Sequence, residues 1–177
     1  LLKNEVTFGV NAIYTNYIQM GFYVTYYVVE DKFVAEDRAD EINQYKESLL
    51  MYGDELTYCL SPNKNTVLLN VIYNFRNYLG FPHFSKNIAK KIWVGGTVSY
   101  LCMQIAYYMG FDQVYLIGFD HSYEIPDNAE VDGHKIVSTI DNDPNHFNKE
   151  YFGKGKRWHD PMLDRMELAY KKAKTYF

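Results

Sequence analysis

Five polar residues follow predicted strands at the point where each strand ends: Asn11, Glu30, Asp31, Asp120 and His121. Amide, carboxylate and imidazole groups can hydrogen-bond a sugar or a base, and the last two can also move a proton. In open α/β sheets, ligands bind outside the carboxyl ends of the strands, so these side chains are expected on one rim. Each residue could instead be a helix cap or a turn residue, and the sequence leaves that alternative open.

A glycine-rich loop is expected to border the same crevice. Gly95, Gly96 and Thr97 precede an apolar stretch with helical spacing, and Asp120 follows the next apolar run. A loop that opens a helix presents backbone N–H groups to an anion, which predicts a nucleotide-binding role for this loop and for Asp120. The alternative is that the glycines only make turns and Asp120 only caps.

A second group of candidate residues lies on the long polar stretch 121–159. His146 could act as a general base near neutral pH. Lys154, Lys156 and Arg157, together with His121, could bind a phosphate or a carboxylate of the substrate. The alternative interpretation is a solvated basic turn with a packed histidine.

The remaining pattern supplies elements to position these residues. Strands are predicted at 6–10, 22–29, 55–60, 66–72, 92–94 and 114–117, and helices at 34–51, 97–109 and from Pro161 onward. Residues 73–89 are expected to form an irregular aromatic flap or a broken helix. Strands that alternate with helices indicate an α/β fold, a Rossmann-like three-layer domain with a mainly parallel sheet.

Composition narrows the class of protein. The 177 residues are 47% hydrophobic and 23% charged, with a net charge of -4, which predicts a globular domain without affinity for nucleic acid. The 18 tyrosines suit a cleft for a polar ring-shaped ligand, a wet core or a subunit interface. Cys59 and Cys102 are expected to be buried thiols of a reducing compartment. No transmembrane run or signal peptide is evident, so we expect the cytoplasm, with the inner face of the membrane as an alternative.

Metal and hydrolase motifs are missing. The histidines show no HExxH pattern, and Asp141-Asn142-Asp143 resembles the start of a calcium loop without its glycine and terminal glutamate. No GxxxxGK[ST] or GxSxG motif occurs. We therefore predict chemistry that needs no metal and no cofactor beyond a nucleotide-sugar co-substrate.

Both ends of the sequence look incomplete. The chain begins with an apolar pair and stops inside a predicted helix, at Thr175-Tyr176-Phe177. We expect residues 1–177 to be one domain that lacks its first and last strands. A parent chain or a homo-oligomer would then cover the open edges.

The stretch TVSYLCMQIAYYMGFDQVYLIGFD at residues 97–120 resembles the core of two related groups. One is the MptE-like family, named for a 6-hydroxymethylpterin diphosphokinase, and the other is the bacterial sialyltransferases of glycosyltransferase family 42. The similarity extends thinly over most of the chain. The tail HFNKEYFGKGKRWHDP is similar to that of proteins from bacterial surface-polysaccharide loci.

The sialyltransferase resemblance implies a glycosyltransferase that uses a nucleotide-activated donor, most plausibly a CMP-sugar, and a saccharide acceptor. In that family the residue matching Asn11 contacts the nucleotide, and the residue matching His146 is the general base. The loop at 95–97 faces the donor, and the residue matching Asp120 lies close by. Asp31 ends a strand that also shares the resemblance, which adds it to the nucleotide-binding candidates.

The sequence departs from the sialyltransferase pattern at three places. The family's tyrosine falls on Ser122, so the adjacent Tyr123 becomes the catalytic candidate. The family's arginine falls on Gly95, and the upstream phosphate-binding loop is not in this sequence. Two alternatives therefore stay open: an MptE-like diphosphokinase that uses ATP and magnesium, and a non-catalytic sugar-nucleotide-binding module.

Overall fold

A computed structural model describes residues 2–73, 80–119 and 121–177. A four-stranded sheet has the order β1 (Phe8–Val10), β2 (Tyr26–Val29), β3 (Leu49–Gly53) and β4 (Thr66–Leu69). All its pairings are parallel. One residue after β4, β5 (Val71–Ile72) pairs in parallel with β6 (Ile92–Trp93). The Rossmann-like fold with a mainly parallel sheet is confirmed.

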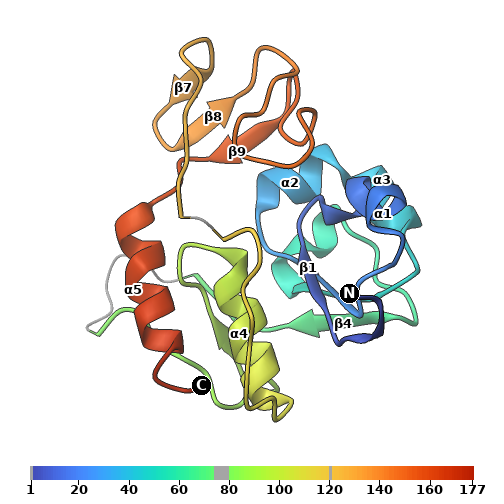
Figure 1. Ribbon diagram of the computed structural model, residues 1–177, viewed down its shortest axis with the longest axis vertical. Helices are drawn as coiled ribbons and strands as arrows, with labels where there is room; N and C mark the ends of the chain where they lie inside the picture. The colour runs from blue at the N-terminus through green and yellow to red at the C-terminus, as the bar shows by residue number, and fades with distance from the viewer. Residues whose placement is uncertain (1, 74–79, 120) are drawn as a thin grey trace.

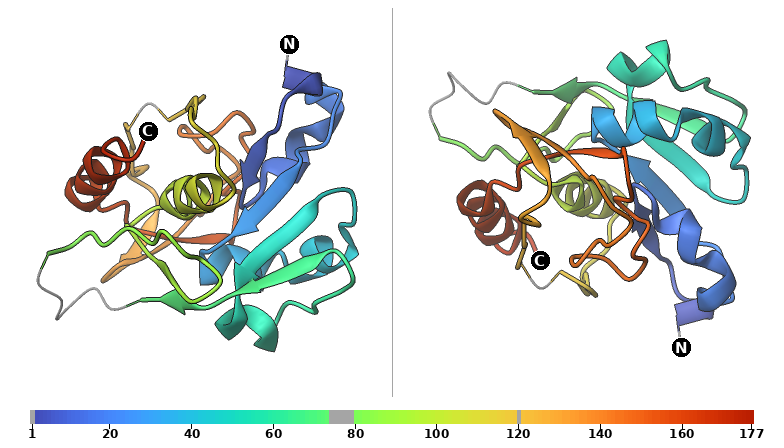
Figure 2. Two further views of the ribbon diagram at one scale, coloured as in Figure 1. Left: turned by 90° about the horizontal axis from the view of Figure 1, so that it is seen from below. Right: turned by 90° about the horizontal axis from the view of Figure 1, so that it is seen from above.

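The sheet separates two hydrophobic layers because side chains alternate along each strand. Tyr27 and Val29 of β2 pack with residues of the short helices α1 (Tyr17–Met20), α2 (Lys32–Asp37) and α3 (Ala39–Gln44). Val28 packs on the opposite side with α4 (Val98–Tyr108) (Figure 2). Short 3₁₀ helices complete the connections: η1 (Leu2–Asn4), η2 (Ile13–Asn16) and η3 (Asp54–Tyr58).

Helix α4 is enclosed on a second side by α5 (Leu163–Ala173). Ala169 and Ala173 of α5 are fully buried against Tyr100 and Met103 of α4 (Figure 1). Small side chains let the two helices approach closely, so this contact gives α4 its almost complete burial. Both helices were predicted from their periodicity, and both are confirmed.

The polar stretch after residue 121 contains a small antiparallel sheet that the sequence did not predict. It consists of β7 (Glu130–Asp132), β8 (Lys135–Val137) and β9 (Arg157–His159). Ile136 and Trp158 pair across it and are buried. The sheet lies at the top of Figure 1, above α2.

The helix predicted at 34–51 is wrong. The chain leaves helical geometry at Arg38, where φ is -131°, and α3 ends at Gln44. Residues 49–53 then form β3, the strand between β2 and β4. Leu50, Met51 and Tyr52 are consecutive and buried, which is the pattern of a strand covered on both faces and not of an amphipathic helix.

The strand predicted at 55–60 is also wrong. This segment is the 3₁₀ helix η3, and Leu56 and Leu60 are both buried in the core. The backbone N–H of Leu60 donates to the carbonyl of Leu56 at 2.9 Å. Apolar residues four positions apart lie on one side of a helical turn, so the same spacing that suggested a strand end serves a turn here.

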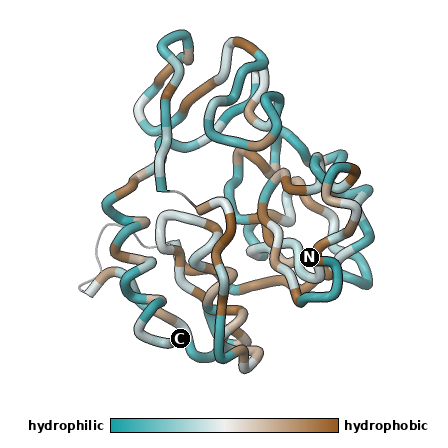
Figure 3. Tube along the Cα trace, viewed as in Figure 1, coloured by the Kyte–Doolittle hydropathy of each residue, from teal (hydrophilic) through white to brown (hydrophobic). Residues whose placement is uncertain are grey.

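The strand predicted at 114–117 does not form. Tyr115 is 82% exposed and Ile117 is 64% exposed, and in the described part of the chain this segment joins no sheet. Figure 3 shows the apolar run after α4 as a connection outside the layers. A short β-rich run becomes a strand only when a neighbouring edge pairs with it, and here the run lacks that pairing.

The aromatic segment at 73–89 falls partly outside the described residues, which omit 74–79. Its described part, 80–89, contains neither helix nor strand. The predicted strand at 66–72 is present but interrupted at Asn70, between β4 and β5. In the described ranges, no helix is long and apolar enough to cross a membrane.

Candidate functional site

The parallel strands end on one rim, and the chain places polar or glycine residues there after each strand. These are Asn11 after β1, Glu30 and Asp31 after β2, Glu55 after β3, Tyr73 after β5, and Gly95 to Thr97 after β6. The rim is where ligands bind in sheets of this kind. Three elements of the candidate site follow from it: an Asp–His pair over β1, another over β2, and a group of carboxyl side chains beside them.

The small sheet and the loop before β9 cover part of this rim. Arg157 of β9 forms ion pairs with Asp37 and Glu36 of α2, at 2.5 and 2.9 Å. Lys156 Nζ donates to the carbonyl of Asp37 at 2.8 Å. The buried Arg38 donates to the carbonyl of Tyr151 at 2.6 Å. These contacts fix the covering loop to α2.

Asp143 and His146 form the first Asp–His pair, on that covering loop. His146 Nδ1 lies 2.8 Å from Asp143 Oδ2, and the Asp143 side chain is only 2% exposed. Burial by itself would raise the pKa of Asp143, but hydrogen bonds from His146 and from the backbone N–H groups of Asn145 and Phe152 bring its pKa below the ordinary value. The carboxylate therefore stays ionised and orients the imidazole, as a general base requires.

Tyr151 joins this pair to the end of β1. The His146 ring stacks on the Tyr151 ring at 3.9 Å with an interplanar angle of 2°. The backbone N–H of Ala12 donates to the Tyr151 hydroxyl at 3.1 Å. His146, on a loop distant in sequence, is thereby held over the residue that follows Asn11.

Asn11 is built into the rim with an unused acceptor. Its φ of 48° is a left-handed conformation that asparagine tolerates better than most residues. Its backbone is fixed because its N–H donates to Val28 and its carbonyl accepts from the Tyr27 hydroxyl. The side-chain Oδ1 is buried without a hydrogen-bond partner. Such an atom costs about 1–3 kcal/mol when unpaired, so it suits a donor group on a ligand.

Asp31 and His159 form the second Asp–His pair, over the end of β2. One carboxylate oxygen caps α2 by accepting from the N–H groups of Phe33 and Val34. The other lies 2.8 Å from His159 Nδ1. Asp31, a predicted nucleotide-binding residue, thus orients an imidazole that comes from β9.

Carboxyl groups gather beside this pair. Burial, followed by the neighbouring carboxylates Asp31 and Glu55, raises the pKa of Glu30 to about 8. Burial also raises the pKa of Glu55. The Tyr73 hydroxyl donates to the Glu30 carbonyl at 3.4 Å. Among the residues that the structure describes, no group of three or more His, Cys, Asp or Glu is arranged to hold a metal ion.

The glycine loop before α4 packs against α5. A Cβ atom on Gly95 would lie 2.4 Å from the Tyr100 ring and 2.9 Å from Ala169 Cβ, so only glycine fits. Gly96 has a φ of 83°, and Thr97 caps α4 by accepting from the Ser99 N–H. The loop therefore has a packing role in this structure, and its predicted contact with a nucleotide stays a prediction.

The other predicted residues lie around the covering loop and α5. Asp120 is outside the described residues. His121 has its Nε2 3.6 Å from Glu167 on α5. Tyr123 lies close enough to Tyr151 for its charge to affect the hydroxyl's pKa. Lys154 is exposed and its backbone N–H donates to Asp141. The structure thus brings Tyr123 to His146 and its neighbours, and places His121 beside α5.

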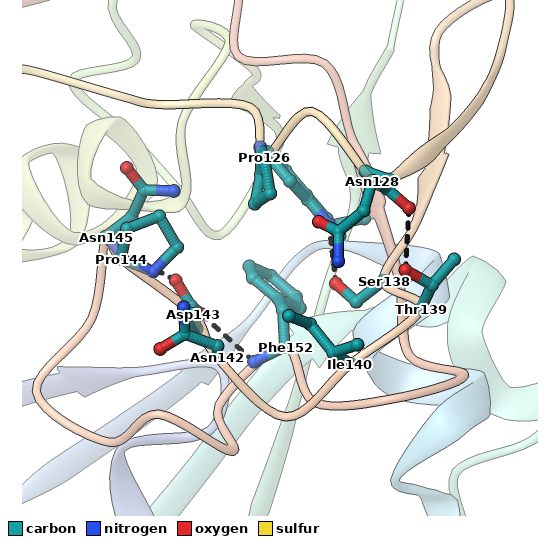
Figure 4. Close-up of a pocket in the computed structure, with 12 residues that line it drawn as sticks. Pro126, Asn128, Ser138, Thr139, Ile140, Asn142, Asp143, Pro144, Asn145 and Phe152 are labelled. Atoms are coloured by element: carbon teal, nitrogen blue, oxygen red, sulfur yellow. Dashed lines mark hydrogen bonds between the residues drawn. The ribbon is translucent and has the colours of Figure 1, made fainter.

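A small cavity lies under the first pair (Figure 4). It is lined by Asp143, Asn145 and Phe152 and has a volume of about 10 Å³. This is room for about one water molecule, so a nucleotide has to bind on the open rim and not here. A wider hollow of about 500 Å³ beside Gly21 and Tyr23 precedes β2, at the opposite end of the strands.

Sequence reasoning missed Asp143, Tyr151 and Arg38. Asp143 was noted only as part of a calcium-like run, although an aspartate three residues before a histidine is a spacing at which the two side chains can meet. Tyr151 and Arg38 gave no local signal, because their partners are 139 and 113 residues away. Only the folded chain shows that they connect the two halves of the site.

A comparison with protein-family models places the N-terminal part of the chain. Residues 1–126 match the model described as 6-hydroxymethylpterin diphosphokinase MptE-like. The chain belongs to this family. Neither the curated proteins nor the solved structures contain a match. The MptE-like match includes Asn11 and Asp31 and ends before the small sheet, so His146 and His159 are supplied by the part of the chain beyond it.

Proposed function

We propose that the chain is a transferase that moves a group from a nucleotide-activated donor to a hydroxyl of an acceptor. The observation that carries this proposal is the Asp143–His146 pair, held over the carboxyl end of β1 by Tyr151. His146 Nε2 accepts the proton of the acceptor hydroxyl as the new bond forms. Asp143 stabilises the ring charge that results, because its carboxylate is buried and ionised.

Asn11 and Tyr123 complete the proposed roles. The buried Oδ1 of Asn11 accepts a hydrogen bond from a ribose hydroxyl or a base amino group of the nucleotide. Tyr123 lies near Tyr151, where its hydroxyl can contact the reacting groups. Lys154 is exposed on the covering loop and can pair with an acidic group of donor or acceptor.

The donor that we favour is a nucleotide sugar, most simply a CMP-sugar, with a saccharide acceptor in surface-polysaccharide synthesis. Support comes from the resemblance of Asn11 and His146 to the nucleotide-binding and base residues of the sialyltransferases. Both residues lie at the end of β1 in this structure, one directly and one through Tyr151. The aromatic and amide surface there suits a pyrimidine nucleoside.

The second candidate is an ATP-dependent diphosphokinase, and a specific observation favours it. The matching family is named for a 6-hydroxymethylpterin diphosphokinase. The rim also carries Glu30, Asp31 and Glu55, close enough to one another that their charges raise the pKa of Glu30. Carboxylates are the ligands that magnesium prefers when it accompanies a triphosphate.

Thermal shift measurements with CMP, ATP and ATP–magnesium separate the candidates. Stabilisation by CMP without metal supports the glycosyltransferase, and stabilisation only by ATP–magnesium supports the diphosphokinase. The Asn11→Gly variant is the site control, because glycine accepts the left-handed backbone and removes only the amide. A stabilisation that persists unchanged in Asn11→Gly, or none with any nucleotide, contradicts the proposal.

A further inference from the structure

The ring of His159 is held on two sides. Its Nδ1 lies 2.8 Å from Asp31, and its face stacks on Phe33 at 4.2 Å with an interplanar angle of 18°. The side chain is 42% exposed, so it is not a core histidine. Because Nδ1 and Nε2 are on opposite sides of the ring, the contact with Asp31 turns Nε2 away from that carboxylate. An exposed imidazole with a fixed orientation is suited to bind a ligand.

Two further cations converge on the same aromatic ring. Lys32 Nζ lies 5.2 Å from the centre of the Phe33 ring, and the Arg157 guanidinium lies 5.0 Å from it. Arg157 is already paired with Glu36 and Asp37. Lys32 is exposed, and in the described part of the chain it forms no ion pair. Its ammonium group, next to His159, is therefore available to an anion.

This group of cations borders the rim that carries the proposed site. Asp31 lies two residues beyond the end of β2, and β2 pairs with β1, whose end carries Asn11. Neighbouring strands are about 4.8 Å apart. His146 and His159 are thus supplied over the ends of adjacent strands, with the nucleoside contact of Asn11 on the first of them.

We propose that His159 and Lys32 bind the phosphate of the nucleotide donor that departs during the transfer. The assignment rests on the proposed function. The acceptor oxygen forms its bond to the transferred group as the bond to the leaving phosphate oxygen breaks. The acceptor proton passes to His146 Nε2, and the leaving oxygen keeps the electron pair. A proton on His159 Nε2 and the Lys32 ammonium hydrogen-bond that oxygen.

Asp31 is then a positioning residue that acts through His159. Its carboxylate accepts the Nδ1 hydrogen, so the ring can present a second N–H at Nε2 to an anion. The predicted contact of Asp31 with the nucleotide becomes indirect. The same arrangement serves a CMP-sugar donor and an ATP donor, because both leave a phosphate oxygen.

Calorimetric titration with inorganic pyrophosphate and with CMP tests this site. The His159→Gln variant should lower the affinity for pyrophosphate about fivefold to tenfold, the worth of one charge-assisted hydrogen bond. Lys32→Gln, at an exposed position, should lower it about threefold without affecting folding. The matched control is His134→Gln, since His134 is an exposed histidine of the same small sheet, 4.0 Å from Asp160.

The outcomes separate this inference from the proposed function. If the wild type binds pyrophosphate through His159 and Lys32 but binds neither CMP nor ATP, the phosphate site stands and the proposed function fails. If the wild type does not bind pyrophosphate, the site is overturned. It is also overturned if His159→Gln and Lys32→Gln bind pyrophosphate as the wild type and His134→Gln do.

Discussion

The two Asp–His pairs use the same contact in different surroundings. Both have a 2.8 Å separation between a carboxylate oxygen and Nδ1. Asp143 and His146 are three residues apart, and their side chains are 2% and 20% exposed. Asp31 and His159 are 128 residues apart, and theirs are 17% and 42% exposed. A buried pair suits proton transfer, because little water competes with it, whereas an exposed pair suits binding of an anion from solution.

The largest expected effect is on turnover when the buried pair loses its base. His146→Ala should reduce kcat by about 10²–10⁴-fold, the usual worth of general-base catalysis, with nucleotide affinity little changed. Steady-state rates with the donor found by thermal shift give the measurement. Full activity in His146→Ala together with its loss in His121→Ala would show that the base lies beside α5 instead.

The next effect concerns the loop that carries the buried pair. Arg38→Met should lower the free energy of unfolding by about 1–3 kcal/mol, because the carbonyl of Tyr151 loses a buried donor. It should also loosen His146 and leave the His159 contact with Asp31 in place. Urea unfolding and pyrophosphate titration measure the two effects. A variant that loses pyrophosphate binding but keeps turnover would reverse the comparison.

The pH dependence of stability distinguishes the two carboxylates. The pKa of Asp143 is lowered in the folded state, so its contribution is present above its ordinary value of 3.8 and is lost as the pH falls through the lower folded pKa. Asp143→Asn should remove that acid-side loss and lower stability at pH 7 by about 1–2 kcal/mol. Urea unfolding from pH 3 to 7 measures both. An unchanged acid-side slope in the variant speaks against a buried, ionised Asp143.

The smallest effect is expected at the exposed pair. Asp31→Asn keeps the α2 cap, since asparagine caps helices nearly as well, so stability should change by less than about 0.5 kcal/mol. The amide carries no charge to balance a doubly protonated His159, so pyrophosphate affinity should fall about threefold. Calorimetry on the variant and on His159→Gln gives the comparison. Equal losses of stability and affinity would mean that Asp31 acts only in folding.

The sequence predicted the parallel layers and the two long helices because their patterns are local. Strand runs such as 26–29 and the helical spacing of α4 and α5 need no distant partner to be recognised. The exposed run 114–117 has equally strong strand character, but the structure gives it no pairing edge. Propensity alone therefore cannot decide whether a short run becomes a strand.

The candidate site was predictable to the same degree. Asn11 and Asp31 were found because they follow strands, and His146 because of a resemblance. The small sheet lies in a polar stretch without clear periodicity, and its contacts with α2 through Arg157 and Lys156 join residues about 120 positions apart. Such pairings are set by the folded chain, so the assignment of Lys156 and Arg157 to substrate could not be weighed against their ion pairs beforehand.

The most direct test of the account is to observe the imidazole signals of the histidines by NMR while CMP is added. The account predicts that His146 and His159 shift together and saturate with one dissociation constant, while the exposed His134 does not move. If only ATP–magnesium produces the joint shift, the diphosphokinase alternative holds for the same site. Saturable nucleotide binding that leaves both His146 and His159 unmoved would contradict a nucleotide site over the ends of β1 and β2.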